Sequence, residues 1–277
     1  MSSTNSLGLI AGNRSLPLIF ARQARSLGIE RLIAVAFEGE TDPGLAPLVD
    51  EIVWLKVGQL SKLIAAFTER KIESCVMLGQ IAPSNLYNVR PDLRAMALLL
   101  RLKQKNAHTI FGGIADELEK DGVRLIEATE WLRPLMPGRG FKLGPKLSDA
   151  QQLDVSFGLR IAKEVSRLEI GQTVVVRKGT VLAVEGFEGT DVCLARGGEL
   201  AGKNGGAVAI KVAKANHDFR FDIPCIGPKT LETCATSGIS VLAFEADRSL
   251  LLEQDTCERI AKENKIALLT VGQTDAT

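Results

Sequence analysis

The stretch from Glu185 to Asp191 contains residue types that could hold a hard cation or a phosphate group. It reads Glu-Gly-Phe-Glu-Gly-Thr-Asp, so a carboxylate recurs at every third residue and two glycines lie between them. It directly follows the apolar run Val181–Val184, which predicts a strand. Carboxylate oxygens are the ligands that Mg²⁺ prefers, and glycines let the backbone approach a ligand closely. The pattern indicates a phosphate-handling loop, and an ordinary exposed turn is the alternative.

A second acidic stretch lies within residues 216–227 and adds Asp218 and Asp222, with Arg220 between them. Because Pro224 disfavours a helix at the residue before it, we expect Asp222 to be presented from extended backbone. We interpret the two acidic stretches as facing halves of one site. Two unrelated exposed loops are the alternative.

Few other side chains could supply chemistry. The only two histidines are His108 and His217, which excludes a histidine-rich dinuclear metal centre. His217 could act as a proton shuttle, although a surface histidine is the plainer interpretation. The five cysteines are scattered and form no Cys-x-x-Cys pair, so we expect reduced thiols rather than disulfides or a zinc site. Any metal must therefore be held by carboxylates, with Lys211 and Arg220 available to balance phosphate charge.

The overall composition narrows the class of protein. A chain of 277 residues can form two domains. Its 34 basic and 33 acidic residues give a net charge of +1, which provides no long-range field for nucleic acid. The longest apolar runs, such as Ala95–Leu100, are too short to span a bilayer, and residues 1–6 do not read as a signal peptide. We therefore expect a cytoplasmic protein without a transmembrane segment that binds no nucleic acid.

The first half of the chain reads as alternating strands and helices, which predicts a parallel α/β domain. The expected strands are Leu7–Ala11, Arg31–Phe37, Ile52–Val57, Cys75–Leu78 and Val123–Ile126. Gly12 and Asn13 follow the first strand and Gln80 follows the fourth, at the strand ends where such sheets bind ligands. The motif G-x-G-x-x-G is absent, although Glu38 stands where a ribose-binding acid would, so a weak dinucleotide interpretation stays open.

Two further segments of the first half need explanation. The expected helix over residues 91–102 carries leucines on more than one face, which indicates burial, a partner, or a groove for an acyl chain. Residues 134–147 are rich in proline and glycine and have no periodicity, so we expect a linker or mobile loop there. We place the first domain at residues 1–135, the linker at 136–149 and the second domain at 150–277.

The second half predicts another α/β domain. A helix ending before Gly171 is followed by a hairpin over residues 174–184 with a glycine turn. The glycine-rich stretch Arg196–Gly206 is expected to be mobile, and the strand Ala207–Val212 carries Lys211. Alternating helices and strands complete the domain.

The motifs quoted above also resemble a known family. Residues 172–191, ending in Val-Glu-Gly-Phe-Glu-Gly-Thr-Asp, closely resemble the UDP-2,3-diacylglucosamine pyrophosphatases of lipid A biosynthesis, of the LpxI type that is unrelated to calcineurin-like phosphoesterases. Further matches are Leu9-Ile-Ala-Gly12 with Leu16-Pro17, Val76-Met-Leu-Gly79, and Arg220-Phe-Asp-Ile-Pro-Cys-Ile-Gly227. The resemblance covers nearly the whole chain, and its C-terminal motifs are the specific ones.

The resemblance implies an enzyme of a Gram-negative bacterium with an N-terminal Rossmann-like domain that contacts acyl and nucleotide groups, and a C-terminal catalytic domain. The expected reaction is Mg²⁺-dependent hydrolysis of UDP-2,3-diacylglucosamine to UMP and 2,3-diacylglucosamine 1-phosphate (lipid X). The motifs make Asp191 and Asp222 the catalytic candidates, and the same two with Glu188 and Asp218 the metal ligands. Expected substrate-binding residues are Gly12, Asn13, Gln80, Thr190, Lys211, Arg220 and Gly227. A homodimer with peripheral contact at the inner membrane is also expected.

The sequence departs from the family pattern at two places. Phe111-Gly112-Gly113-Ile114 stands where Phe-Gly-Asp-Asp is expected, so acids at that place are not essential. His217-Asp218 stands where Gln-Asp is expected, which keeps Asp218 usable. A non-catalytic protein that binds nucleotide sugars is the principal alternative function, and a dinucleotide oxidoreductase is a second.

Overall fold

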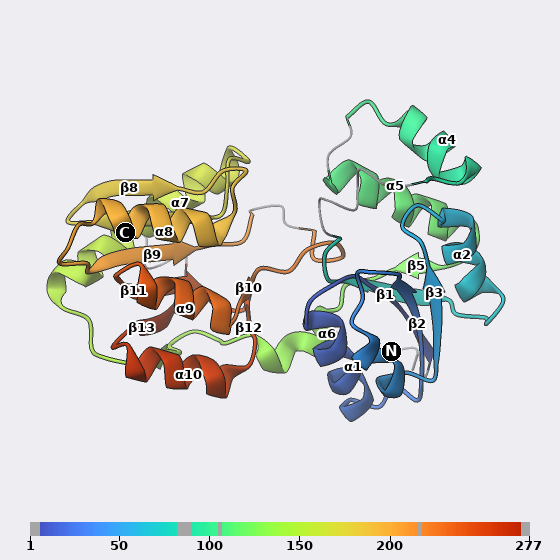
Figure 1. Ribbon diagram of the computed structural model, residues 1–277, viewed down its shortest axis with the longest axis horizontal. Helices are drawn as coiled ribbons and strands as arrows, with labels where there is room; N and C mark the ends of the chain where they lie inside the picture. The colour runs from blue at the N-terminus through green and yellow to red at the C-terminus, as the bar shows by residue number, and fades with distance from the viewer. Residues whose placement is uncertain (1–5, 82–89, 105–106, 215–217, 273–277) are drawn as a thin grey trace. The chain divides into compact units, whose positions relative to one another are not determined.

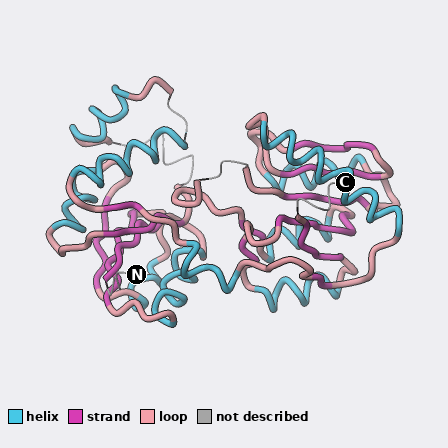
Figure 2. The backbone as a smooth tube through the Cα atoms, turned by 180° about the vertical axis from the view of Figure 1, so that it is seen from behind, coloured by secondary structure: helices cyan, strands magenta, loops and turns pink. Residues whose placement is uncertain are grey.

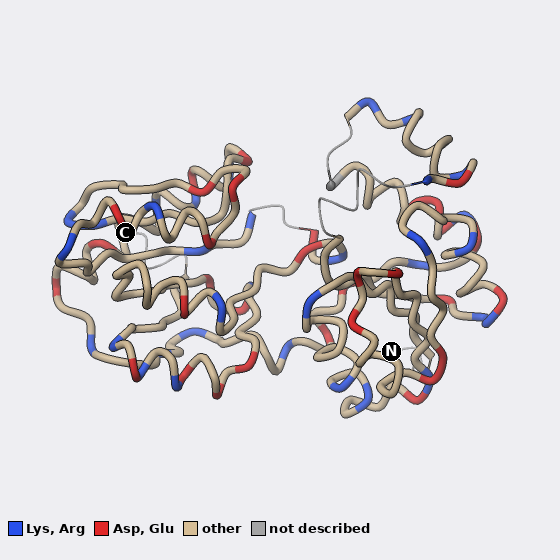
Figure 3. Tube along the Cα trace, viewed as in Figure 1, with Lys and Arg blue, Asp and Glu red and all other residues tan. Residues whose placement is uncertain are grey.

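The computed structural model describes residues 6–81, 90–104, 107–214 and 218–272. The chain forms two compact units (Figure 1). Unit 1 comprises Met1–Leu132 together with Asp218–Asp222, and unit 2 comprises Arg133–His217 with Ile223–Thr277. Positions of Lys and Arg and positions of Asp and Glu both occur along the trace of each unit (Figure 3).

Unit 1 is built on a parallel five-stranded sheet, which confirms the predicted Rossmann-like domain. The strands are β1 (Ser6–Ala11), β2 (Arg31–Phe37), β3 (Glu51–Leu55), β4 (Ser74–Leu78) and β5 (Arg124–Leu125). They lie in the order β3-β2-β1-β4-β5, and each adjacent pair is parallel. The central strands read as continuous apolar runs because both faces of a parallel sheet are covered. The sheet order reverses between β1 and β4, which makes the carboxyl ends of these strands the expected ligand site.

Helices cover the sheet of unit 1 on both faces (Figures 1 and 2). They are α1 (Leu16–Ser26), α2 (Leu60–Thr68), α4 (Leu93–Arg101), α5 (Ala107–Lys120) and α6 (Thr129–Leu132), with the 3₁₀ helix η1 (Pro43–Leu48). Phe67 of α2, Leu98 of α4 and Leu118 of α5 share one buried apolar cluster with residues of the sheet. Apolar burial of this kind stabilises the unit and positions α4 and α5 beside each other.

Unit 2 contains a mixed six-stranded sheet. Its strands are β6 (Lys142–Leu143), β7 (Thr173–Arg177), β8 (Thr180–Val184), β9 (Ala207–Lys211), β11 (Ile239–Glu245) and β13 (Ala267–Val271), in the order β6-β13-β11-β9-β7-β8. β9, β11 and β13 are parallel, whereas β6, β7 and β8 pair antiparallel to their neighbours. Two short strands, β10 (Cys225–Ile226) and β12 (Leu250–Leu251), form a separate parallel pair.

The helices of unit 2 pack on opposite faces of its sheet. Val174 and Val176 point into a cluster with α7 (Asp149–Arg167), whereas Val175 points into a cluster with α8 (Thr190–Leu200) on the other face. The same second cluster includes residues of α9 (Pro228–Thr236) and α10 (Gln254–Glu263), and Phe141 and Leu143 pack against it. The alternation is the two-residue period of a strand buried on both sides. After η2 (Arg133–Leu135), the chain enters this sheet through β6.

The predicted hairpin is confirmed, and a buried carboxylate supports its turn. Lys178 and Gly179 connect β7 to β8 with φ angles of 49° and 72°, the positive values that a tight two-residue turn requires. The side chain of Asp154 on α7 is 5% exposed and accepts both turn N–H groups at 2.8 Å. Asp154 thus joins α7 to the hairpin.

The stretch Arg196–Gly206 was expected to be mobile, and this expectation is wrong for its first part. Residues up to Leu200 lie in α8, where Gly197 and Gly198 are buried. A Cβ atom at Gly197 would lie 2.5 Å from the Cβ of Val175, and one at Gly198 would lie 1.8 Å from the carbonyl oxygen of Ser237. These glycines therefore serve close packing of the helix on its neighbours rather than backbone freedom.

The region predicted as a linker also has structure. Within residues 136–149, β6 pairs with β13, and α7 begins at Asp149 with Ser148 in a capping box. Two residues of edge strand are too few to show periodicity in the sequence. The division between the units follows Leu132, and Asp218–Asp222 belong to unit 1, which no feature of the sequence indicated.

Candidate functional site

Three predicted substrate-binding residues meet at the carboxyl edge of the sheet in unit 1. The Gly12 N–H donates to the carbonyl of Leu78 at 2.8 Å, and the Asn13 N–H donates to the carbonyl of Gln80 at 2.7 Å. A Cβ atom at Gly12 would lie 2.5 Å from the Gln80 carbonyl oxygen, so only glycine lets the two strand ends come this close. The structure thus brings Gly12, Asn13 and Gln80 together at the point where the strand order reverses.

The Asn13 side chain has one hydrogen-bonding atom to spare. Its Nδ2 donates to Oε2 of Glu40 at 2.8 Å, and this fixes which way the amide faces. Its Oδ1 is buried and has no hydrogen-bond partner among the residues that the structure describes. A buried acceptor without a partner costs stability unless a donor reaches it, so this oxygen is suited to receive an N–H or O–H group of a ligand.

In unit 2, the beginning of α8 gathers a second set of polar groups. Lys211 Nζ at the end of β9 donates to Thr190 Oγ1 at 2.9 Å, and this hydroxyl donates to Glu185 Oε1 at 3.0 Å. Gly189 precedes the helix with φ = 85°, a conformation that favours glycine. The second carboxylate oxygen of Glu185 is buried and finds no hydrogen-bond partner in the described part of the chain. The predicted residues Thr190 and Lys211 are therefore neighbours, and Glu185 belongs with them.

Asp191 connects the beginnings of two helices. Its carboxylate lies 3.1 Å from Nζ of Lys229, the second residue of α9, and Gly227 is the N-cap of that helix. Unpaired N–H groups and the helix dipole make such helix beginnings favourable for anions. With Lys211 and Lys229 nearby, this edge of unit 2 is suited to phosphate oxygens. Sequence reasoning missed Lys229, because nothing in the sequence pairs it with Asp191.

Glu188 is held in its own loop. Its carboxylate accepts the Gly186 N–H at 3.0 Å and pairs with Arg196 at 2.7 Å. Hydrogen bonds from backbone N–H groups, together with the Arg196 side chain, lower the pKa of Glu188. These contacts stabilise the loop before α8 and keep the carboxylate ionised.

Only the part of the second acidic stretch from Asp218 to Asp222 lies in unit 1. Asp218 accepts hydrogen bonds from the Arg220 guanidinium at 3.0 and 2.7 Å, and this charge pair raises the pKa of Arg220. The predicted substrate-binding residue Arg220 is therefore engaged with Asp218. Asp222 follows in the same segment and is exposed. His217 lies outside the described residues.

The predicted carboxylates do not form a ready metal site within either unit. Glu188 and Asp191 belong to unit 2, whereas Asp218 and Asp222 belong to unit 1. Within the described ranges, no group of three histidine, cysteine, aspartate or glutamate side chains is placed to hold a metal ion.

Four of the five thiols, those of Cys75, Cys193, Cys234 and Cys257, are unsuited to nucleophilic chemistry. Burial raises the pKa of Cys193, Cys234 and Cys257 to about 12, and it also raises that of Cys75. Thiols of this kind stay protonated at neutral pH and are poor nucleophiles. The burial of these thiols is consistent with the prediction that the chemistry proceeds without a cysteine nucleophile.

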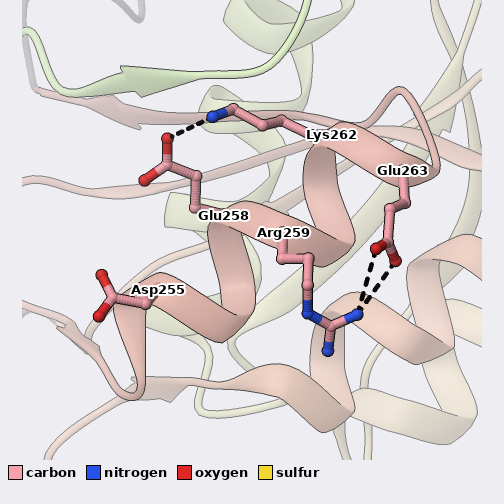
Figure 4. A pocket seen from close by; sticks show the side chains of 5 residues that line it. All are labelled: Asp255, Glu258, Arg259, Lys262 and Glu263. Atoms are coloured by element: carbon pink, nitrogen blue, oxygen red, sulfur yellow. Dashed lines mark hydrogen bonds and ion pairs between the residues drawn. The ribbon is translucent and has the colours of Figure 1, made fainter.

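A shallow hollow on α10 has no relation to the predicted residues. It is lined by Asp255, Glu258, Arg259, Lys262 and Glu263 (Figure 4). Lys262 pairs with Glu258 at 3.0 Å and Arg259 pairs with Glu263 at 3.1 Å, each one helical turn apart. Such pairs are typical of a solvated helix face.

Comparison with known proteins gives a match to both halves of the chain. The family models described as "LpxI N-terminal domain" and "LpxI C-terminal domain" match residues 6–135 and 138–269. "UDP-2,3-diacylglucosamine pyrophosphatase LpxI" of Caulobacter vibrioides is 31% identical over 280 residues, which cover 96% of each chain.

Solved structures match only weakly. A biotin carboxylase from Campylobacter jejuni is 14% identical over 71% of this chain and 42% of its own, with a TM-score of 0.29. The biotin carboxylase domain of Hydrogenobacter thermophilus 2-oxoglutarate carboxylase is 17% identical over 63% of this chain and 35% of its own, with a TM-score of 0.25. Less than half of each of those chains is matched, and scores this low carry no argument about function.

Proposed function

Because the chain belongs to the LpxI family, we propose that it hydrolyses the pyrophosphate bond of UDP-2,3-diacylglucosamine during lipid A synthesis. Water adds across the P–O–P bridge, and the products are UMP and 2,3-diacylglucosamine 1-phosphate. The observation that carries the proposal is that both domain models match, in order, across both units.

The polar groups of the two units suit different parts of the substrate. In unit 2, Lys211 and the beginnings of α8 and α9 would bind diphosphate oxygens, since they combine a cationic side chain with helix N–H groups. Thr190 holds the Lys211 ammonium in place through its hydroxyl. In unit 1, the unpaired Asn13 Oδ1 would accept a hydrogen bond from the nucleotide or the sugar.

Asp222 and Asp191 are the proposed catalytic groups. Asp222 is exposed on a short turn and would accept the proton of the attacking water as the new P–O bond forms. Asp191 would keep Lys229 oriented toward developing negative charge, since the two side chains already pair. Removal of one electrostatic group of this kind costs on the order of a hundredfold in turnover.

A requirement for Mg²⁺ is part of the proposal and rests on the family and on the oxygen-rich donors alone. When bound, the ion would neutralise phosphate oxygens and polarise water. Glu188, Asp191, Asp218 and Asp222 would supply its oxygen ligands, and within the described residues no three such side chains are already gathered around one point.

The exposed face of α4 is the proposed contact for the acyl chains. Ala95 and Leu98 are buried, whereas Leu93 is 85% exposed, Met96 46% and Leu100 80%. An apolar stripe of this kind on a helix that already buries its other face is suited to contact lipid. No helix in the described part of the chain is long and apolar enough to cross a bilayer. We propose a cytoplasmic homodimer with peripheral contact at the inner membrane.

Purified protein incubated with UDP-2,3-diacylglucosamine tests the proposal through release of UMP. We expect release with Mg²⁺ present, its loss after metal removal by chelation, and its return when Mg²⁺ is added back. Release that persists after complete metal removal would refute the Mg²⁺ requirement and leave the hydrolysis standing. Tight substrate binding without UMP under any condition would favour a non-catalytic nucleotide-sugar protein instead.

A further inference from the structure

The segment Asp218–Asp222 is packed with unit 1, although the residues described on either side of it, up to Lys214 and from Ile223 onward, belong to unit 2. Ile223, the first residue after the segment that is assigned to unit 2, is only 5% exposed. A segment of five residues that leaves its own unit needs contacts that hold it in place, since ordering each residue costs about 1–2 kcal/mol in backbone entropy.

Phe221 supplies the apolar contact. Its side chain packs against the buried cluster of unit 1 that includes Leu98 of α4 and Leu118 of α5. Its ring centroid lies 6.1 Å from that of Phe111 on α5, with the planes inclined at 33°. Aromatic pairs at this separation attract each other beyond their burial of area. The Phe221 side chain therefore attaches the segment to α5.

The rest of the segment forms a closed turn around this ring. The Phe221 N–H donates to the Asp218 carbonyl at 3.1 Å, and the Asp218 carboxylate accepts the Arg220 N–H at 3.1 Å as well as the Arg220 guanidinium. The guanidinium carbon lies 4.9 Å from the centre of the Phe221 ring, within the range of a cation–π contact. Asp218 and Arg220 thus hold the turn in the shape that directs Phe221 to the core.

Asp222 comes directly after the ring, is exposed, and directs its N–H to the same Asp218 carbonyl at 3.4 Å. We propose that Phe221 is a positioning residue, whose ring against Phe111 fixes the turn that presents the Asp222 carboxylate. The proposal rests on the function proposed above, in which Asp222 acts in hydrolysis. A displacement of about 1 Å at a reacting group can cost on the order of a hundredfold in rate, so loss of the ring affects chemistry even when the fold survives.

Four variants test this role. Phe221→Ala and Phe111→Ala each remove one ring of the pair, and Phe221→Leu keeps an apolar side chain of useful size. Phe20→Leu is the control: Phe20 is fully buried in unit 1 against Trp131 and lies outside the cluster that receives Phe221. For each protein, kcat and KM for UMP release are measured, together with hydrogen–deuterium exchange of the peptide that contains residues 218–222.

We expect both alanine variants to lower kcat by about tenfold to a hundredfold with KM nearly unchanged, and to accelerate exchange in that peptide. Phe221→Leu should restore most of the rate. Phe20→Leu should lower the melting temperature without changing kcat.

Three outcomes are contrary to the proposal. The positioning role is overturned if Phe221→Ala has the wild-type kcat, or if hydrogen–deuterium exchange of its 218–222 peptide is unchanged. It is also overturned if kcat falls as much in Phe20→Leu as in Phe221→Ala. Each of these outcomes leaves UMP release by the wild type intact. Absence of UMP from the wild-type protein would overturn the proposed function itself and, with it, the role of Phe221 in the reaction.

Discussion

Glu117 is a buried carboxylate on which three basic side chains of unit 1 converge. It lies on α5 and is 5% exposed. Its oxygens pair with Arg94 at 2.7 Å, with Lys120 at 2.6 Å, and with Arg101. Arg94 and Arg101 come from α4, so Glu117 holds the helix with the exposed apolar face against α5. Replacing it with glutamine removes the charge and keeps the shape.

The size of the effect follows from the pKa. The hydrogen bonds from Lys120, Arg94 and Arg101 lower the pKa of Glu117 from 4.5 to about 2. Because one pKa unit corresponds to about 1.4 kcal/mol, the upper bound at neutral pH is roughly 3 kcal/mol. Arg101 and Lys120 are more than half exposed, so solvent screening reduces the expected loss on Glu117→Gln to about 1–2 kcal/mol.

The sign with pH is also determined. The folded-state pKa lies below the unfolded value, so the stabilisation is fully present above about pH 5 and is lost as pH falls toward 2. Urea unfolding at pH 7 and pH 3 should show a larger difference between wild type and Glu117→Gln at pH 7. Asp121→Asn is the control, since Asp121 also pairs with Arg94 but is 40% exposed, and it should cost less than about 1 kcal/mol. An equal difference at both pH values, or none at pH 7, would show that the ionised Glu117 carboxylate does not stabilise the fold.

Three further predictions concern the hairpin, the phosphate-binding edge and the acyl contact. Asp154→Ala leaves two turn N–H groups without an acceptor, so it should lower the free energy of unfolding by about 1–3 kcal/mol. Urea unfolding would measure this loss. A smaller loss would mean that water replaces the carboxylate as the acceptor. Lys211→Met should raise KM or lower kcat for UMP release by about tenfold or more. The melting temperature of this variant should stay near that of the wild type. Unchanged kinetics would mean that the diphosphate binds elsewhere. Because Leu100 lies on the exposed apolar face of α4, Leu100→Gln should weaken turnover of the diacylated substrate more than binding of UDP-glucosamine. Equal losses for both ligands would contradict an acyl contact on α4.

The fold could be predicted from the sequence because most of its strands are buried on both faces. β1, β2 and β4 read as short apolar runs bounded by turn residues, and the helices between them show one apolar face. The prediction of a mobile stretch at Arg196–Gly206 failed because glycine serves either backbone freedom or close packing. Gly197 and Gly198 lie in a helix because neighbouring atoms leave no room for a Cβ, and the sequence alone does not distinguish that need from backbone freedom.

The candidate site could be predicted only in part. Gly12, Asn13 and Gln80 follow from the rule that parallel sheets bind ligands where strand order reverses, and the structure brings them together. Pairings such as Asp191 with Lys229 depend on how two helices pack, which no local pattern records.

The position of Asp222 was also beyond local reasoning. The division of the acids between two units, with Asp222 in unit 1, was not foreseeable because it depends on tertiary contacts of residues 218–222 with unit 1, among them the packing of the Phe221 ring. The assignments of metal ligands and catalytic acids accordingly stay predictions.

The central claim is that this protein cleaves a pyrophosphate bond, and ³¹P NMR of the purified protein with UDP-2,3-diacylglucosamine and Mg²⁺ tests it most directly. We expect the two diphosphate signals to disappear while two phosphomonoester signals, from UMP and the acylated sugar 1-phosphate, grow in equal amounts. The same sample with Asp222→Ala should retain the diphosphate signals far longer, with the protein folded as judged by thermal melting. Persistent diphosphate signals in the wild-type sample, with substrate bound and Mg²⁺ present, would contradict the claim.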